Sequence, residues 1–411
     1  MTFQKPKGTR DQYPEGRAVF NRIAEAMRNC AGSYAFREVE SPAFEDLNLL
    51  TAKSGEEIKQ QIFTLEKRGD EEFGLRFDLT VPFTRMFIEK QKILPKPVKW
   101  FSIGRMWRYE RPQAGRLREF YQLSAEVFGS PKPEADAEII SLAIDCLKNL
   151  GLTKKDFVVR INNRVLLQDF IKSIGGKDIE AVFRAIDKKQ KIPSEDFDNE
   201  LKKAGLDDEQ KKKIKEFIEV RDINKIEIES EGLDNLKKIL SMLKNREDFI
   251  EVDLSTARGL AYYTGTVFEI FDRRGRFRSL AGGGRYDNMI KLFGGEPCPA
   301  TGFAIGFATL RLLLEEKNLL PEPELGADYY IAPLGEKARE TAGIIAEKFR
   351  KEGKSVETDL IGRSPSKQLD YANKTGAKSI IFIGDEEIKK GKARIKDMKT
   401  GDEKEIAIGD I

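Results

Sequence analysis

Hydrophobic side chains recur every three to four residues in several stretches of the chain. Over residues 16–34 this spacing predicts a helix with one apolar face. The same spacing, followed by a glycine, predicts another helix over residues 134–150. Hydrophobic and polar residues alternate over residues 99–108 and 118–128, which predicts two strands. The segment between these strands holds a proline and a glycine, so we expect an antiparallel hairpin.

Residues 171–247 differ in composition from the segments on either side. They contain 18 Lys or Arg and 18 Asp or Glu, with few residues that favour strands. The apolar positions, such as Ile214, Phe217 and Ile218, recur at helical spacing and predict a mostly helical insertion. A solvated charged surface without a function of its own explains this composition equally well.

Glycine-rich, strand-like sequence fills residues 250–310, and a helix is predicted over residues 306–317. Residues 319–323 have the composition of a linker. Strands and helices then alternate and end in a hairpin, which predicts a small parallel or mixed α/β domain. We therefore expect four parts: the first and second parts of a catalytic domain, a helical insertion between them, and a C-terminal domain. Their predicted bounds are 1–170 and 248–320, 171–247, and 325–411.

The composition restricts the chemistry because the 411 residues include no histidine. Catalytic triads, Cys-His nucleophiles, HExxH zinc sites and histidine bases are all excluded. The three cysteines, Cys30, Cys146 and Cys298, form no CxxC motif, which argues against a disulfide framework or a thiolate zinc site. No run approaches the roughly 20 apolar residues of a membrane span. The N-terminus has no apolar signal region, so a cytoplasmic protein is expected.

Total charge gives little guidance, since 72 Lys and Arg against 69 Asp and Glu leave a net charge of +3. The local pattern is more informative, because five arginines fall within 14 residues around the predicted hairpin loop. Guanidinium groups hold phosphates bidentately, and the aromatic residues among these arginines can stack on a purine. A solvated arginine-rich hairpin is the alternative. The arginines are Arg105, Arg108, Arg111, Arg116 and Arg118.

Two further segments are unusual, although each is weak when taken alone. The composition of residues 281–287 predicts a glycine-rich turn, which lacks the GxxxxGK[ST] pattern of a P-loop. Residues 258–265 combine an arginine, two tyrosines and flanking glycines. Glycine runs often serve only close backbone approach, and tyrosines are more often core residues than ligands.

Taken together, these segments resemble histidyl-tRNA synthetases, a family of class II aminoacyl-tRNA synthetases. KGTRD and the later Ser-Pro resemble the motif 1 region, and the hairpin resembles motif 2. RGLAYYTG resembles the histidine motif RGLDYYTG, GGGRYD matches a further motif, and GFAIG matches the start of motif 3. The segments are residues 7–11, 41–42, 108–129, 258–265, 282–287 and 302–306.

The resemblance implies an α+β fold: a class II antiparallel-sheet catalytic domain with a helical insertion, and a C-terminal α/β anticodon-binding domain. Two positions depart from the family pattern. Ala261 stands where the histidine motif has Asp, and Thr309 stands where motif 3 has an arginine. Arg311 follows two residues later, which places it on another face of a helix. How the outer phosphates of ATP would be held is therefore left open.

The resemblance also implies the reaction and its partners. Histidine and ATP, with Mg²⁺, would form histidyl-adenylate, and tRNA(His) would then accept the histidyl group on a homodimeric enzyme. Arg258 and Arg108 would be catalytic. Histidine would contact Asp78, Thr80, Gln122, Glu126, Tyr262, Tyr263 and Arg258; ATP would contact Arg108, Glu110, Arg116 and Phe120; and the tRNA acceptor end would contact Arg111 and Gln113. No protein side chain is predicted to bind the metal.

Purely structural roles compete with two of these assignments. Glu126 could be a carboxylate on the surface of a strand, and Tyr263 could be an aromatic residue of the core. Two other functions also compete with the ligase. A synthetase-like regulatory subunit would bind histidine without aminoacylation, and the changes at positions 261 and 309 favour it slightly. The retained Arg108, Gln122, Glu126 and Arg258 and the apparent anticodon domain favour the ligase more. A different adenylate-forming ligase would select another acid, and the motif at residues 258–265 argues against it.

Overall fold

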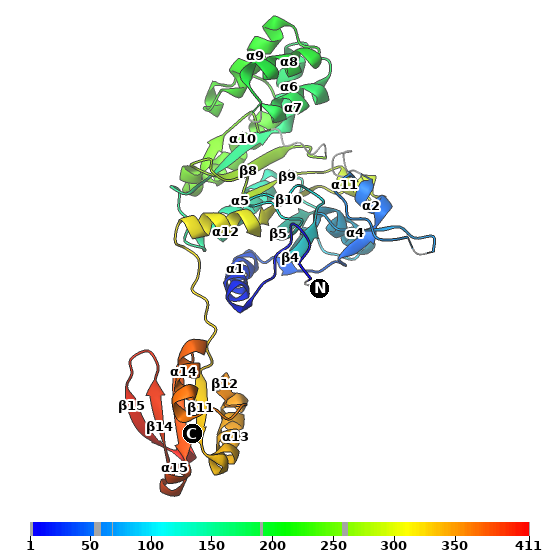
Figure 1. Ribbon diagram of the computed structural model, residues 1–411. Coiled ribbons are helices and arrows are strands. Elements are labelled where there is room, and N and C mark those ends of the chain that lie inside the picture. The colour runs from blue at the N-terminus through cyan, green and yellow to red at the C-terminus, as the bar shows by residue number, and fades with distance from the viewer. Residues whose placement is uncertain (1–2, 53–58, 68, 190–191, 257–261, 411) are drawn as a thin grey trace. The chain divides into compact units, whose positions relative to one another are not determined.

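The two strands predicted on either side of the arginine-rich loop form the central hairpin of the computed structural model (Figure 1). The structure describes residues 3–52, 59–67, 69–189, 192–256 and 262–410. Strands β4 (Val98–Trp107) and β5 (Glu119–Phe128) pair antiparallel in one continuous register. The predicted hairpin is therefore confirmed. Because side chains alternate along a strand, Phe120, Gln122 and Glu126 share one face of β5.

The hairpin belongs to an eight-stranded sheet with the order β1-β4-β5-β10-β9-β8-β6-β7. The pairs β1–β4 and β6–β7 are parallel, and the other neighbouring pairs are antiparallel. Strands β2 and β3 form a separate two-stranded sheet. The remaining bounds are β1 Arg37–Glu38, β2 Phe44–Asp46, β3 Phe73–Leu75, β6 Phe157–Asn163, β7 Ile250–Val252, β8 Thr266–Asp272, β9 Ala281–Arg285 and β10 Ala300–Gly306.

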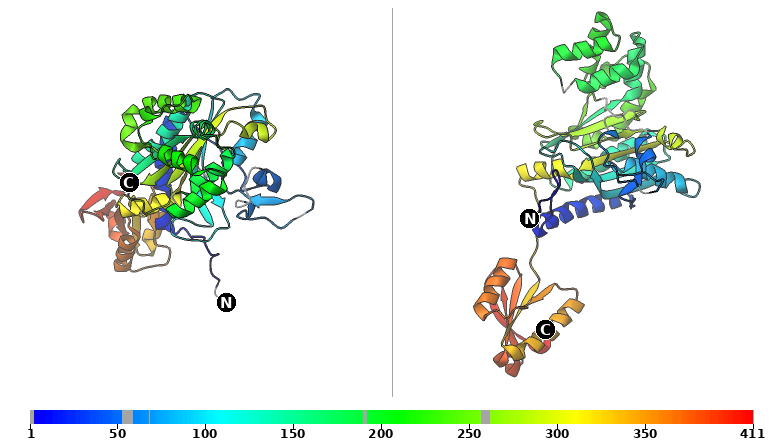
Figure 2. Two further views of the ribbon diagram at one scale, coloured as in Figure 1. Left: turned by 90° about the horizontal axis from the view of Figure 1, so that it is seen from above. Right: turned by 45° about the vertical axis from the view of Figure 1, so that its right-hand side comes forward.

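Helices cover this sheet and supply much of its apolar core. Helix α5 packs on β5, β9 and β10, and α12 contacts β5 and β10. Phe87 of α4 stacks on Phe128 of β5 with ring centroids 4.6 Å apart, and both rings are fully buried. The helices of this part are α1 Pro14–Ser33, α2 Leu47–Thr51, α4 Thr80–Lys90, α5 Pro133–Lys148, α11 Met289–Leu292 and α12 Phe307–Glu316. Figure 2 shows two further views of this arrangement.

Helix α4 begins at Thr80 and contains Pro82 in its first turn. A proline fits this position because the first backbone N–H groups of a helix have no intrahelical acceptor. The carboxylate of Asp78 accepts a hydrogen bond from Val81 N at 3.3 Å, which satisfies one of these groups.

The charged stretch at residues 171–247 is mostly helical, as predicted. Its last helix, α10, packs against α5 and α6 and contacts β6 and β8. Gly232 permits this contact, since a Cβ atom there would lie 2.3 Å from Leu166 N. The bounds predicted for the insertion, residues 171–247, and for the other three parts of the chain remain predictions. The helical elements are α6 Arg164–Ser173, α7 Ile179–Lys188, α8 Ser194–Lys203, α9 Asp208–Ile218, η1 Ile223–Lys225, α10 Glu231–Met242 and η2 Lys244–Phe249.

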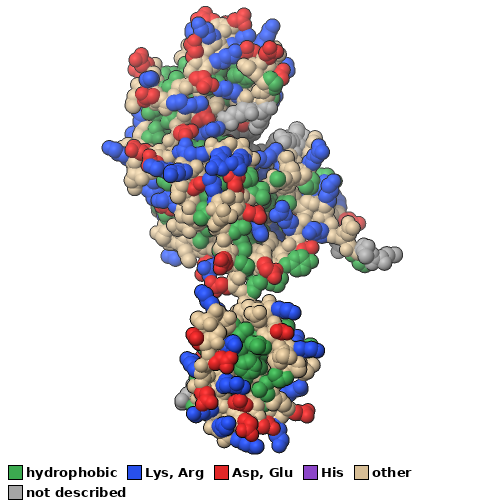
Figure 3. Space-filling view, turned by 60° about the vertical axis from the view of Figure 1, so that its left-hand side comes forward, with side chains coloured by type: hydrophobic (Ala, Val, Ile, Leu, Met, Phe, Trp, Pro, Cys, Tyr) green, Lys and Arg blue, Asp and Glu red, His purple; other side chains and the backbone are tan. Residues whose placement is uncertain are grey.

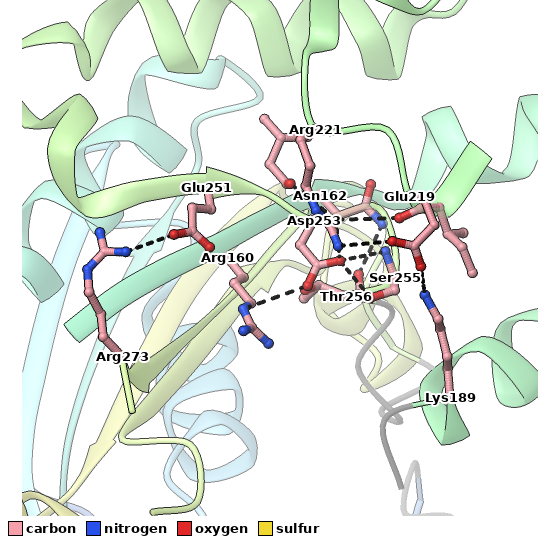
Figure 4. Close-up of polar contacts among 12 residues, drawn as sticks. Arg160, Asn162, Lys189, Glu219, Arg221, Glu251, Asp253, Ser255, Thr256 and Arg273 are labelled. Carbon is pink, nitrogen blue, oxygen red and sulfur yellow. Dashed lines mark hydrogen bonds and ion pairs between the residues drawn. The ribbon is translucent and has the colours of Figure 1, made fainter. Parts of the chain in front are cut away.

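A polar network centred on Asp253 joins the segment after α9 to the sheet (Figure 4). The buried Asp253 carboxylate accepts hydrogen bonds from Arg221 Nη1 at 3.0 Å and from Ser255 Oγ at 2.6 Å. It also lies 3.8 Å from Arg160 Nε on β6. Beside it, Asn162 Nδ2 donates to the backbone oxygens of Leu254 and Thr256. The network fastens the chain that follows β7.

The chain separates into two compact units, whose main bodies are residues 22–321 and 322–411. The smaller unit has a five-stranded sheet with the order β12-β11-β13-β14-β15. Its first three strands are parallel and its last two pair antiparallel, so the predicted mixed α/β fold is confirmed. The elements are β11 Tyr329–Leu334, α13 Glu336–Lys351, β12 Val356–Thr358, α14 Pro365–Thr375, β13 Ser379–Gly384, α15 Asp385–Lys390, β14 Lys392–Asp397, β15 Glu403–Ala407 and η3 Ile408–Asp410.

Charges of both signs are distributed over the surface, as the small net charge suggests (Figure 3). Among the described residues, no helix combines the length and hydrophobicity that crossing a membrane requires. The three cysteines are free thiols, and Cys146 in α5 lies close enough to Cys30 in α1 to lower the pKa of the Cys30 thiol. The helical fold thus brings together two cysteines that lie far apart in the sequence.

Candidate active site

A pocket of about 310 Å³ opens on the face of the sheet that carries Gln122 and Glu126. Strands β5, β8, β9 and β10 contribute to its walls, together with the loop between β4 and β5. Most of the predicted site residues meet here although they come from distant parts of the chain. Those lining it are Asp78, Thr80, Arg108, Glu110, Arg116, Phe120, Gln122, Glu126, Tyr262 and Tyr263.

Small residues on β10 form the floor of this pocket. Gly302, Ala304 and Gly306 alternate along the strand, so all three face the same side, and all three line the pocket. Gly302 is paired with Glu126 in the strand register. A Cβ atom at Gly302 would lie 1.5 Å from Glu126 Oε2, so only glycine leaves space for this carboxylate. The GFAIG segment therefore shapes the floor.

Glu126 occupies the enclosed end of the pocket and is only 1% exposed. Thr80 Oγ1 donates a hydrogen bond to Glu126 Oε1 at 2.9 Å, and the Tyr286 hydroxyl donates to Oε2. Burial raises the pKa of Glu126 to about 8, even though both hydroxyl donors favour the ionised form. The carboxyl group can therefore gain or lose a proton near neutral pH, which suits contact with an imidazole ring.

Two polar side chains next to Glu126 extend this wall. Burial raises the pKa of Asp78, and the nearby Arg108 guanidinium acts in the opposite direction. Gln122 Oε1 is buried and has no hydrogen-bond partner among the described residues. An unpartnered buried acceptor is costly, so this oxygen suits a donor supplied by a ligand. An α-ammonium group suits both side chains, since it can donate a hydrogen bond to the Gln122 oxygen and its positive charge can pair with the Asp78 carboxylate.

The loop between β4 and β5 brings arginines to the pocket. Arg108 Nε donates to Phe77 O at 3.0 Å, and its guanidinium lies 5.3 Å from the centre of the Phe120 ring. Arg116 forms an ion pair with the buried carboxylate of Glu110. The loop turns at Gly115, whose φ of +74° favours glycine. Arginine and aromatic groups thus lie together, as nucleotide binding requires.

The structure does not bring every predicted residue to this pocket. Arg111 and Gln113 are exposed on the hairpin loop and are not among the described residues that line it. Arg258 and Ala261 lie outside the residues that the structure describes. Tyr262 and Tyr263 both line the pocket, with ring centroids 4.6 Å apart.

No role was predicted for Tyr286, although the GGGRYD motif that contains it was recognised as a family motif. Two neighbouring residues of this motif have different roles. The Tyr286 hydroxyl contacts Glu126, whereas the neighbouring Arg285 faces α5 and donates to Asp136 Oδ2 at 2.9 Å. Both Arg285 and Asp136 are buried, so this pair joins the helix to the sheet. Strand alternation within the motif was the available signal, since adjacent residues face opposite sides.

Three more pocket residues were missed or left without a role: Glu269 on β8, Arg278 before β9, and Thr309 on α12. Thr309 Oγ1 donates to Gly115 O at 3.4 Å, which brings α12 against the hairpin loop. Thr309 is the position at which the sequence departs from motif 3. Arg311 is not among the described residues that line the pocket, in agreement with its place on another helix face.

An antiparallel sheet that carries such a pocket beneath an arginine-bearing hairpin loop defines the catalytic fold of a class II aminoacyl-tRNA synthetase. The family model described as Histidyl-tRNA synthetase matches residues 8–310, and the model described as Anticodon binding domain matches residues 328–411. The chain belongs to the histidyl-tRNA synthetase family.

Relatives and solved structures support this membership over the whole chain. A histidine–tRNA ligase of Pyrococcus furiosus is 40% identical over 423 residues, covering 100% of this chain and 98% of that protein. The histidyl-tRNA synthetase structure from Nostoc sp. PCC 7120 is 27% identical, has a TM-score of 0.83, and covers 99% of this chain and 97% of its own.

One further structure shares the fold. It is described as an ATP phosphoribosyltransferase regulatory subunit/histidyl-tRNA synthetase from Bacillus halodurans C. Its TM-score is 0.77 at 24% identity, with 93% of this chain and 99% of that chain covered. At this identity the likeness shows the fold alone.

Proposed function

We propose that this chain is a histidine–tRNA ligase that works in the cytoplasm. It activates histidine with ATP to histidyl-adenylate and pyrophosphate, and then transfers the histidyl group to tRNA(His). The observation that carries the proposal is the buried carboxyl of Glu126 in a pocket that arginines also line. Relatives such as the Pyrococcus furiosus ligase, similar over their full length, support the same activity.

The first step needs no histidine side chain on the enzyme. The α-carboxylate of the substrate has a pKa of about 3.5, so it is ionised at neutral pH without a base. It attacks the α-phosphorus of ATP, and pyrophosphate leaves. The protein then has to position both reactants and stabilise the charge on the phosphoryl oxygens. We assign this to Arg108 and Arg258, with Arg108 at the α-phosphate.

The rest of ATP extends along the hairpin side of the pocket. Phe120 stacks on the purine, since its ring faces the pocket beside Arg108. Glu110 serves the adenine region and at the same time orients Arg116 through their ion pair. Arg116 then faces the outer phosphates. Guanidinium groups suit this role because each presents several N–H donors in one plane.

Histidine binds at the enclosed end. Glu126 and Tyr263 contact the two imidazole nitrogens, and Tyr262 borders the ring. Asp78, Thr80 and Gln122 hold the α-amino group, which provides donors for the unpartnered oxygen of Gln122. An apolar analogue of histidine would leave these buried groups unpaired, and this penalty gives the enzyme its selectivity.

Magnesium would accompany ATP. The described residues hold no group of three or more His, Cys, Asp or Glu side chains arranged for a metal. Mg²⁺ usually takes one or two carboxylates besides phosphates and water, so its binding with ATP does not need such a group. The described residues that line the pocket include four carboxylic acids, and the two that are not assigned to histidine, Glu110 and Glu269, would be the ones to contact the ion. When bound, the ion neutralises charge on the phosphates.

The second step involves the tRNA and the smaller unit. The exposed loop residues Arg111 and Gln113 approach the acceptor end, where a terminal ribose hydroxyl attacks the histidyl carbonyl and AMP leaves. Residues 325–411 read the unstacked anticodon bases, as single-stranded RNA recognition favours. The match of residues 328–411 to the anticodon-binding family supports this assignment. We further propose that the active form is a homodimer.

Pyrophosphate exchange tests the first step directly. The purified protein is incubated with ATP, labelled pyrophosphate and one amino acid at a time. We expect exchange that depends on histidine, followed by charging of tRNA(His) in a second assay. Binding of histidine without exchange at saturating ATP would instead support the regulatory subunit. Exchange driven by another acid would support a different adenylate-forming ligase.

A further inference from the structure

Three arginines are among the described residues that line the pocket, and they differ in how their charge is balanced. Arg116 is paired with the buried Glu110 carboxylate, and Arg108 lies near Asp78 and donates to Phe77 O. Arg278 also lines the pocket, yet it forms no hydrogen bond or ion pair with any residue that the structure describes. Its guanidinium is therefore available to a negatively charged ligand.

Backbone hydrogen bonds show where Arg278 enters the pocket. Leu280 N donates to Ile270 O at 2.8 Å, and Gly306 N donates to Leu280 O at 3.0 Å. The segment that precedes β9 therefore lies between β8 and the end of β10. All five residues from Arg278 to Gly282 line the pocket, so this segment runs along its wall and brings Arg278 to it.

This end of the pocket lies away from the histidine end. Glu126 pairs with Gly302 in the strand register, whereas the Arg278 segment adjoins Gly306. The two glycines are four positions apart on strand β10, which corresponds to about 13 Å. The surroundings are open, since a Cβ atom at Gly306 would meet its nearest neighbour only at 4.0 Å. Glu269 on β8, which pairs with Gly282 in the strand register, also lines the pocket. Ala308 and Thr309 complete this wall.

We propose that Arg278 binds the outer phosphates of ATP together with Arg116. The inference rests on the proposed function, because it takes ATP as the ligand of this pocket. Arg116 alone brings a charge that Glu110 already balances, whereas the outer phosphates need further cationic donors. A guanidinium at the rim can hold two phosphate oxygens with parallel N–H donors.

Binding of ATP and AMP separates this role from the alternatives. Isothermal titration calorimetry is carried out with Mg²⁺-ATP and with AMP on the full chain and on Arg278→Ala. We expect ATP affinity to fall about tenfold, the lower range for a charge-assisted hydrogen bond, because Arg278 is exposed at the rim. AMP, which lacks the outer phosphates, binds both proteins equally. Arg278→Lys keeps the charge and loses less ATP affinity than Arg278→Ala.

Arg276→Ala is the matched control. Arg276 lies on the same segment, pairs with Glu316 at 3.2 Å, and is not among the described residues that line the pocket. Arg274 also reaches Glu316, at 3.4 Å, so this carboxylate keeps a partner. We expect ATP affinity to stay at the level of the unaltered chain.

Two results would overturn the proposal. Unchanged ATP affinity in Arg278→Ala would remove Arg278 from the nucleotide, and an equal loss for ATP and AMP would assign it to the adenine end or to the fold. Neither result depends on catalysis. If the unaltered chain binds ATP but shows no histidine-dependent exchange, the proposed function fails, while the comparison of ATP with AMP still decides the role of Arg278.

Discussion

The Glu126 carboxyl shows how a single residue can combine selectivity with a cost in stability. Its two hydroxyl partners, Thr80 and Tyr286, donate to opposite oxygens, and Gly302 leaves the space in which it lies. Burial nevertheless raises its pKa to about 8, because two hydrogen bonds do not replace the water that an ionised carboxylate loses. At neutral pH the free enzyme therefore favours the protonated form.

This shift predicts how stability changes with pH. The folded chain holds the Glu126 proton more tightly than the unfolded chain, so its contribution to stability is complete below pH 4.5 and is lost as pH rises to about 8. Glu126→Gln removes this loss. As pH rises through this interval, the free energy of unfolding of the original chain should therefore fall by about 5 kcal/mol relative to that of the variant. Urea unfolding at several pH values measures the difference. Parallel curves for the two proteins would contradict a raised pKa.

Gly302 offers a steric test of the same site. In Gly302→Ala the added Cβ would overlap Glu126 Oε2, so the carboxylate has to move. Overpacking of this kind costs about 1–3 kcal/mol, and we expect histidine affinity to fall about five- to a hundredfold. The control is Gly306→Ala on the same strand and face, where the nearest atom is 4.0 Å away. Calorimetric titration with histidine compares them; equal affinities in both variants would mean that Glu126 does not contact the ligand.

At the scale of elements, strand register determines which residues meet. Glu126, Gly302 and Gly284 lie side by side on β5, β10 and β9, although their positions in the sequence are far apart. The Arg285–Asp136 pair then joins α5 to this sheet from its other face. Asp253 plays a similar role where the helical stretch after α9 rejoins the sheet. Buried charges thus fasten the helices around the pocket.

The Asp253 network predicts a localised loss of stability. In Asp253→Asn, Arg221 and Arg160 lose their shared carboxylate, and we expect the free energy of unfolding to fall by about 2–3 kcal/mol. This is less than the cost for a fully buried pair, since the Arg221 side chain is 52% exposed. Asp248→Asn is the control, because its exposed pair with Lys154 should contribute less than about 1 kcal/mol. Equal urea midpoints for the two variants would show that the Asp253 network stabilises the fold no more than an exposed ion pair does.

The sequence predicted local structure and motif membership better than it predicted contacts. Periodicity predicted α1, α5 and the β4–β5 hairpin because these depend on neighbouring residues. Motifs placed Glu126 and Tyr263 among the site residues, and both line one pocket. The bond from Tyr286 to Glu126 could not be predicted, since it depends on how distant strands align. The contact between Cys30 and Cys146 likewise depends on helix packing rather than on spacing.

Arg278 illustrates a different limit. No motif marks this position, and its charged neighbours make it look like part of an ordinary solvated turn. Its place in the pocket follows only from the backbone bonds that hold Leu280 between β8 and β10. The composition, by contrast, gave a sound restriction, because a chain without histidine can still activate an amino acid whose carboxylate is already ionised.

At the scale of the molecule, all described residues of the pocket belong to the larger unit, from Asp78 to Thr309. A chain that ends at Pro321 therefore keeps the whole pocket and loses the match to the anticodon-binding family. We expect this truncated chain to retain histidine-dependent pyrophosphate exchange and to lose charging of tRNA(His). The full-length chain, assayed in parallel, is the control. Charging at an undiminished rate would contradict the proposed role of residues 325–411.

The absence of histidine from the chain makes bound histidine easy to observe by spectroscopy. Because no side chain of the protein carries an imidazole, every imidazole signal from the complex comes from the substrate. Nitrogen-15 chemical shifts of labelled histidine would report the tautomer and protonation of that ring without background from the protein. Since Glu126 has a pKa of about 8, a titration through this range follows the sharing of a proton between carboxyl and ring in the intact enzyme.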